Sequence, residues 1–139
     1  MRRLAILAAL NFLISSAFAA DLAVDLQLVL AVDVSRSMDV DEQRLQRDGY
    51  VAAFRHPDVL QAIADGALGR IAVSYVEWAG PGYNRIVGPW TVIASPADAE
   101  KFAAKLAAAS FSHETGTSIS SGLVFAAYLL EESGFNSVR

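Results

Sequence analysis

The sequence contains no cysteine and only two histidines among its 139 residues. Disulfide bonds are therefore excluded, and a zinc site built from cysteine and histidine ligands gains no support. The length suits one domain or part of one, because domains typically run to ~100–200 residues. That domain must be held together by an apolar core, a bound metal or a partner.

Long hydrophobic runs are also scarce, and the one that stands out lies at the N-terminus. The basic pair Arg2-Arg3 precedes an apolar run from Leu4 to Ile14, and Ala17-Phe18-Ala19 fits the A-x-A cleavage pattern. A membrane anchor is the alternative, but eleven residues cannot cross a hydrocarbon core that needs ~20. We expect residues 1–19 to be a secretory signal peptide cleaved after Ala19, and residues 20–139 to form a periplasmic or secreted domain.

Basic residues are outnumbered, with 11 Lys and Arg against 15 Asp and Glu and a net charge of −4. Loss of Arg2 and Arg3 with the signal peptide would make the remaining chain more acidic still. Nucleic-acid binding rests on a basic face that displaces phosphate counterions, and the sequence has no Lys or Arg cluster. Nucleic acid is therefore not an expected partner, and no second apolar run predicts a transmembrane segment.

The rest of the sequence alternates between strand and helix patterns. The apolar segment 26–33 ends at an acid, which is typical of a strand buried on both faces. A helical pattern over 42–55 follows and ends before Pro57; its predicted buried stripe is Leu45, Tyr50, Ala53 and Phe54. Further elements are expected at 58–65 (helix), 71–78 (strand), 85–93 (strand, bulged at Gly88-Pro89), from Pro96 behind the N-cap Ser95 (helix), 119–132 (helix) and from 136 (the first step into a strand).

This order of elements predicts an α/β fold, a doubly wound sheet with helices on both faces. Only a short turn separates segments 71–78 and 85–93, so these strands should form an antiparallel hairpin. A doubly wound sheet places its first strand centrally, yet here no later strand returns to the other side of 26–33. We expect an incomplete sheet of about three strands with an open edge, and hence a truncated chain whose last strands are missing.

The most informative stretch follows the first predicted strand and contains Asp33, Ser35 and Ser37. It offers one carboxylate and two hydroxyls at the carboxyl end of a strand, where doubly wound folds bind ligands. Oxygen ligands of this kind suit Mg²⁺. A loop that merely caps the next helix would favour the same residue types, so the spacing alone leaves both interpretations open.

Other known binding and catalytic loops are excluded because this sequence lacks residues that they require. A calcium-binding EF-hand loop beginning at Asp33 would need glycine and glutamate where Met38 and Arg44 stand. A phosphatase with a nucleophilic aspartate would place a second aspartate at Ser35. The sequence contains neither GxGxxG nor GxxxxGK[ST], so a dinucleotide site or a P-loop has no support.

Asp33, Ser35 and Ser37 match D-x-S-x-S, and Thr117 follows in the glycine-containing loop Thr115-Gly116-Thr117-Ser118 before a helix. In this the sequence resembles von Willebrand factor A-like domains, whose metal-ion-dependent adhesion site combines these two motifs. The resemblance covers about residues 25–139 and is strongest to an uncharacterised branch of exported bacterial proteins.

The resemblance implies a Rossmann-like fold and a non-catalytic function. The domain would hold Mg²⁺ (or Mn²⁺ or Ca²⁺) through Asp33, Ser35, Ser37 and Thr117, and a Glu or Asp from a protein partner would complete the coordination. The family supplies a further aspartate from a later loop, which this sequence does not reach. The expected affinity is therefore weak, with a dissociation constant of about 10⁻⁴–10⁻³ M, the range of weak extracellular calcium sites.

Two alternatives to a metal-dependent binding module are a metal-assisted hydrolase on the same scaffold and a truncated chain without metal function. His113 and Glu114 adjoin the threonine loop, but the segment around Ser118 lacks the final glycine of G-x-S-x-G, so no catalytic constellation is found. His113 is expected in a solvent-facing loop. Glu77 is either a further ligand near the site or, as alternation predicts, a side chain that points outward. The charged helical face of Glu42, Arg44, Arg47 and Asp48 is expected to be solvated.

Overall fold

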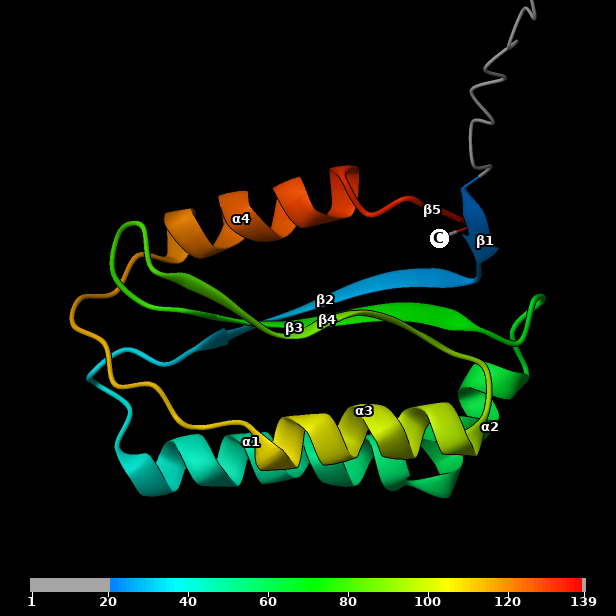
Figure 1. The fold of residues 1–139 in the computed structure, drawn as a ribbon, viewed down its shortest axis with the longest axis horizontal. Helices are drawn as coiled ribbons and strands as arrows, with labels where there is room; N and C mark the ends of the chain where they lie inside the picture. The colour runs from blue at the N-terminus through cyan, green and yellow to red at the C-terminus, as the bar shows by residue number, and fades with distance from the viewer. Residues whose placement is uncertain (1–20, 139) are drawn as a thin grey trace, which may run out of the picture.

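The computed structural model describes residues 21–138, so the predicted signal peptide lies outside the described residues. A central sheet is covered by helix α4 on one face and by α1, α2 and α3 on the other (Figure 1). The α/β class with helices on both faces is thus confirmed. The elements are β1 (Leu22–Val24), β2 (Leu26–Asp33), α1 (Val40–Arg55), α2 (Pro57–Ala64), β3 (Ile71–Trp78), β4 (Asn84–Ile93), α3 (Pro96–Ala108), α4 (Ile119–Glu131) and β5 (Phe135–Ser137).

The main sheet has the strand order β2-β3-β4. Strands β2 and β3 pair in parallel, with Leu26 opposite Ile71 at one end and Asp33 opposite Trp78 at the other. Strands β3 and β4 form the predicted antiparallel hairpin, and their register shifts on either side of Tyr75, which pairs with Gly88. The irregularity expected at Gly88-Pro89 is therefore confirmed.

A second, two-stranded sheet was only half expected from the sequence. Strand β5, whose start was expected, pairs in parallel with β1, which was not, and not with the main sheet. The amide of Gln27 fastens this small sheet to the start of β2, because its Nε2 donates to the Phe135 carbonyl and to the Ser137 hydroxyl, each at 3.2 Å. Three-residue strands carry too little pattern to be recognised in a sequence.

The hydrophobic core lies between the main sheet and helices α1 and α3. Phe54 of α1 and Phe102 of α3 meet edge to face with their ring centroids 4.9 Å apart. They share one core cluster with the buried Tyr75 and Ile93 of the sheet. Side chains of this size contribute ~1.5–3 kcal/mol each when buried. Ser95 and Pro96 begin α3 as expected, since the Ser95 hydroxyl accepts the amide hydrogen of Asp98.

Two burial expectations are wrong. Leu45 is 76% exposed, because α1 turns Gln43, Arg47, Val51 and Phe54 toward the sheet. Strand β2 was expected to be buried on both faces, yet residues 26–30 are only half-buried and Ala31 is exposed. The reason is the position of β2 in the sheet. Within residues 21–138 it is an edge strand with one neighbour, which agrees with the open edge expected from the sequence.

Helix α4 covers the other face of β2 and β3 through a small part of its surface. A Cβ at Gly122 would lie 2.7 Å from Cγ of Trp78, so the helix backbone packs directly on the indole ring. Its outer surface is apolar, with Ile119, Leu123, Val124 and Tyr128 exposed. Among the described residues, no helix is long and apolar enough to cross a membrane.

The largest departure from expectation is a buried charge network around Glu77. Glu77 and Arg47 form an ion pair, and their side chains are 0% and 3% exposed; Arg85 approaches the other Glu77 oxygen at 3.5 Å. Alternation does place Glu77 on one face of β3, but helices cover both faces, so neither direction leads to solvent. The predicted solvated position of Arg47 is wrong for the same reason. Burial also raises the pKa of the neighbouring Tyr75 to about 12.

Removing one charge of this pair should strongly destabilise the fold. We expect Glu77→Gln to lower the free energy of unfolding by about 3–5 kcal/mol, because Arg47 would keep its charge in a buried site without a counter-ion. Urea unfolding measures this loss. The matched control is Asp41→Asn in the exposed Arg44–Asp41 pair, which should cost less than about 1 kcal/mol; equal losses in the two variants would contradict the assignment.

Candidate metal site

The candidate site is built where β2 and β3 end side by side. Asp33 is the last residue of β2 and pairs with Trp78, the last residue of β3. Beyond Asp33 the chain stays in register for one more hydrogen bond, from the Val34 amide to the Trp78 carbonyl at 2.9 Å. Ser35 is fully buried at this edge. The loop therefore leaves the sheet at its carboxyl end, as the sequence predicted.

Asp33, Ser35 and Ser37 are brought together by hydrogen bonds within the loop. The Ser35 amide donates to Oδ1 of Asp33 at 2.7 Å, and the hydroxyls of Ser35 and Ser37 lie 2.9 Å apart. Two oxygens bound at right angles to one Mg²⁺, each at 2.0–2.1 Å, would be separated by about 2.9 Å. The two hydroxyls already lie at an ordinary hydrogen-bonding distance, which neighbouring ligands of such an ion can also adopt, and the donor set of oxygens alone suits it.

Helix capping does not explain these serines. Helix α1 is capped by Asp39, whose Oδ1 accepts the amide hydrogens of Asp41 and Glu42, each at 2.8 Å. Glu42 reaches back to the Asp39 amide at 2.9 Å, which completes a capping box. Ser35 and Ser37 precede this cap and are not part of it.

The threonine loop meets the aspartate loop through the backbone. Glu114 forms an isolated parallel bridge with Ser35, and the Ser118 amide donates to the Ala79 carbonyl at 2.8 Å. Thr117 lies between these anchors with an exposed side chain. Among the hydrogen bonds within residues 21–138, none joins Thr117 to Asp33, Ser35 or Ser37, so the two loops meet through their backbones.

Glycine makes this meeting of loops possible. Gly80 follows β3, and a Cβ there would lie 2.5 Å from the Thr115 carbonyl oxygen. Gly116 faces Gly80 from the other side and has a φ of +81°, which disfavours any other residue. The threonine loop can therefore rest on the end of β3 only while both positions lack a side chain.

The buried charge network extends to the segment that leads into the threonine loop. Arg47 donates to the Ala109 carbonyl at 2.6 Å, and its guanidinium carbon lies 4.2 Å from the centre of the Phe111 ring. Arg85 donates to the Ser110 carbonyl at 3.1 Å and to the Ser112 hydroxyl at 2.7 Å. This support was not predicted from the sequence. The signal for this network in the sequence was Glu77, an acid within a predicted apolar strand. The arginines that pair with it, Arg47 and Arg85, belong to two other predicted elements.

Among the hydrogen bonds within residues 21–138, none joins His113 to Ser118. His113 is exposed, as expected. The Ser118 hydroxyl caps α4 by accepting the Ser121 amide hydrogen at 3.3 Å and also contacts the Ser120 hydroxyl. Within the part of the chain that the structure describes, no three His, Cys, Asp or Glu side chains gather into a group that could hold a metal. Any metal held here would depend chiefly on Asp33 and neutral oxygens.

Comparison with known proteins places the chain in a family. The sequence model of the family described as "Protein of unknown function (DUF1194)" matches residues 23–139. The chain belongs to this family. A search of curated proteins finds no match.

Among solved structures, the DUF1194 chain is similar to the vWF domain of the type V pili tip protein Mfa5 from Porphyromonas gingivalis, with 16% sequence identity and a TM-score of 0.48. The match covers 78% of this chain and 33% of that structure. The DUF1194 chain thus spans about a third of the length of the protein that it matches.

The contact between Gly80 and the threonine loop can be tested by a single methyl group. We expect Gly80→Ala to destabilise the chain by about 1–3 kcal/mol, because the new Cβ must displace the Thr115–Gly116 backbone. Urea unfolding measures the change. Gly49→Ala in α1 is the matched control: its Cβ meets nothing within 4 Å, so it should stabilise the chain by about 0.5–1 kcal/mol. A neutral Gly80→Ala variant would show that the loops do not rest on each other.

Proposed function

We propose that the chain is an adhesion-type, protein-binding module that holds a divalent cation through Asp33, Ser35, Ser37 and Thr117. The observation that carries the proposal is the gathering of one carboxylate and two hydroxyls in a single loop at the carboxyl end of β2. The resemblance of D-x-S-x-S and the threonine loop to von Willebrand factor A-like domains supports the same ligand set.

The charge of such a site explains what it would bind. Asp33 contributes one negative charge and the three hydroxyl ligands contribute none, so a bound Mg²⁺ or Mn²⁺ keeps a net positive charge. A carboxylate from a partner's Glu or Asp completes the coordination and removes that charge. Helices α1 and α4 begin nearby and oppose a cation by only ~0.3–1 kcal/mol each, which is small beside a direct bond to a carboxylate.

Metal binding should appear as added thermal stability. A cation at 100 times its dissociation constant adds about 2.7 kcal/mol to the free energy of unfolding. We therefore expect excess Mg²⁺ or Mn²⁺ to raise the Tm of the parent chain but not that of Asp33→Ala. The control Asp41→Asn, an exposed carboxylate at the start of α1, should respond like the parent. A Tm that is indifferent to metal in the parent, or that rises equally in Asp33→Ala, would refute the site.

We also propose that the module acts outside the cytoplasm after export. The proposal rests on the basic start, the short apolar run and the A-x-A pattern of residues 1–19. Mass spectrometry of the mature protein from periplasm or medium should give an N-terminus at Ala20. A protein found in the cytoplasm with its first residues intact would contradict it.

A further inference from the structure

The two arginines of the buried charge network differ in what they hold. Arg47 is 3% exposed and forms the buried ion pair with Glu77. Arg85 is 35% exposed, and its 3.5 Å approach to Glu77 is long for a hydrogen bond. Glu77 would therefore keep a buried counter-ion without Arg85, so the fold depends less on Arg85 than on Arg47.

The shorter contacts of Arg85 go to the segment that leads into the threonine loop. Its Nη1 donates to the Ser112 hydroxyl at 2.7 Å and to the Ser110 carbonyl at 3.1 Å. Its Nη2 donates to the Ser110 hydroxyl at 3.1 Å. One planar guanidinium thus holds two residues of the segment in a fixed geometry, which the single ammonium of a lysine would not reproduce.

The segment held by this arginine continues directly into the parts of the loop that lie at the candidate site. Glu114, two residues further on, forms the bridge with Ser35. Thr117 follows with an exposed side chain, and the Ser118 amide closes the loop on the Ala79 carbonyl at 2.8 Å. The position of the Thr117 hydroxyl therefore depends on where the segment before it is held.

We propose that Arg85 is a positioning residue for the metal site, which fixes the position of Thr117 and so sets how tightly a divalent cation binds. This inference rests on the proposed function, since Thr117 is one of the four proposed ligands. Among the hydrogen bonds within residues 21–138, those of Arg85 reach none of these ligands, so Arg85 acts through the loop. Residues that orient metal ligands from outside typically change the affinity for the ion by about 10–100-fold.

The charge of Arg85 makes the expected result specific. A positive charge near a bound cation repels it, so electrostatics alone would make binding tighter when Arg85 is neutralised. A positioning role predicts the opposite, because a loosely held Thr117 is a poorer ligand. The direction of the change in affinity therefore separates the two effects.

The test titrates the full chain with Mn²⁺ and follows free Mn²⁺ by its electron paramagnetic resonance signal. We expect Arg85→Gln to weaken binding about tenfold or more, and Arg85→Lys, which keeps the charge but not the planar fork, to weaken it less. The matched control Arg55→Gln removes the same charge from the exposed Arg55–Glu100 pair and should change the affinity less than about twofold, because exposed charges are screened. Unchanged or tighter binding in Arg85→Gln would overturn the proposal.

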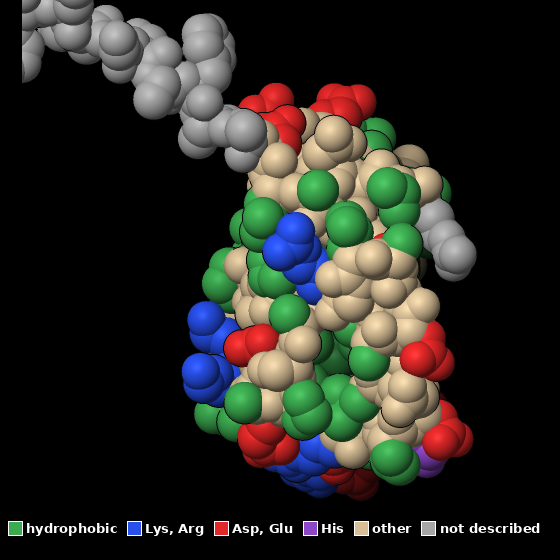
Figure 2. All heavy atoms as spheres, turned by 90° about the vertical axis from the view of Figure 1, so that its right-hand side faces the viewer, with side chains coloured by type: hydrophobic (Ala, Val, Ile, Leu, Met, Phe, Trp, Pro, Cys, Tyr) green, Lys and Arg blue, Asp and Glu red, His purple; other side chains and the backbone are tan. Residues whose placement is uncertain are grey.

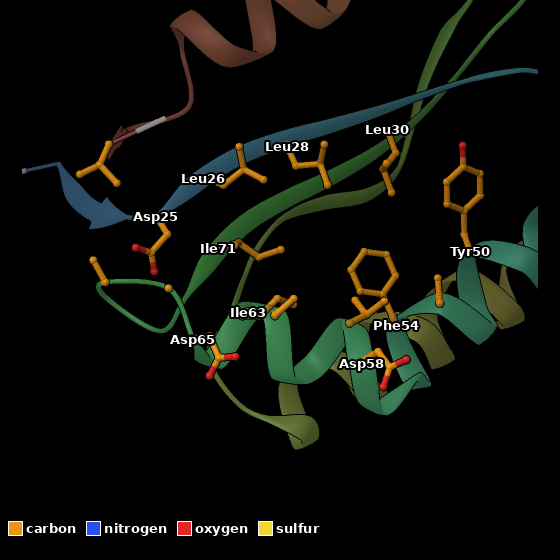
Figure 3. Close-up of a pocket in the computed structure, with 16 residues that line it drawn as sticks. Asp25, Leu26, Leu28, Leu30, Tyr50, Phe54, Asp58, Ile63, Asp65 and Ile71 are labelled. Carbon is orange, nitrogen blue, oxygen red and sulfur yellow. The ribbon is translucent and has the colours of Figure 1, made fainter.

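A second group of acids must be kept apart from this measurement. Asp25, Asp58 and Asp65 lie around the hollow between β2 and helices α1 and α2 (Figure 3). Figure 2, which looks onto this end of the molecule, shows hydrophobic side chains in the hollow and acidic side chains near it. Neither Arg85 nor any proposed ligand lines the hollow.

The control for these acids is Asp58→Asn combined with Asp65→Asn, since the Asp25 carboxylate already accepts backbone amide hydrogens. Both altered side chains are exposed, and the double variant should bind Mn²⁺ like the parent. Loss of binding in this variant would place the measured cation at the hollow and would overturn the proposal.

Amide hydrogen exchange tests the positioning role in the absence of metal. The Ser118 amide should exchange faster in Arg85→Gln than in the parent, relative to the amides of β3, which report opening of the whole fold. Ser112→Ala removes one acceptor of Arg85 and no charge, and should show the same pattern to a smaller extent. An unchanged Ser118 amide, or an equal acceleration of the β3 amides, would overturn the proposal.

The two readouts also separate this inference from the proposed function. A parent chain that binds no Mn²⁺ would refute the proposed function, and the exchange of the Ser118 amide would then decide the positioning role alone. A parent that binds Mn²⁺ through Asp33, together with an Arg85→Gln variant that binds equally well, would leave the metal site in place and refute the role of Arg85.

Discussion

A carboxylate that cannot reach water organises this molecule. Glu77 lies in the strand that helices cover on both faces, and it remains there because Arg47 and Arg85 pair with it. Both arginines also donate to the backbone of the segment after α3. One buried negative charge therefore positions two cations, and the cations fix the path of the chain that enters the threonine loop. A buried network of this kind gives a definite arrangement only when its members are satisfied together.

The candidate site depends on that path. The aspartate loop is built locally, from the end of β2 and the cap of α1, while the threonine loop arrives from more than seventy residues later in the sequence. It is held from one side by the arginines and from the other by the contact between Gly80 and Gly116. The local half of the site brings its oxygens within hydrogen-bonding distance. The distant half is placed by backbone contacts, and its threonine side chain stays exposed.

Local features of this fold could be predicted from the sequence, and contacts between distant segments could not. Strands β2, β3 and β4, the hairpin, the helices and the D-x-S-x-S loop follow from periodicity, turn residues and caps, all of which are local. The acid within an apolar strand is visible in the sequence, but its buried pairing with Arg47 could not be deduced, because only the packing of α1 on the sheet brings the two residues together. The pairing of β1 with β5 is equally non-local. Leu45 was misplaced because the inward face of α1 carries Gln43 and Arg47 beside Val51 and Phe54, which a purely apolar stripe does not predict.

The packing of Trp78 against Gly122 gives the site its own optical probe. The indole ring of Trp78 packs on the first turns of α4, and α4 begins directly after the threonine loop. The backbone of Trp78 pairs with Asp33. The chain has only one other tryptophan, and that residue, Trp90, packs on Phe135 of β5 with the ring centroids 5.7 Å apart. With Trp90 replaced by phenylalanine, the tryptophan emission of the protein would come from Trp78 alone, so movements of α4 and of both loops could be followed by it in unlabelled protein.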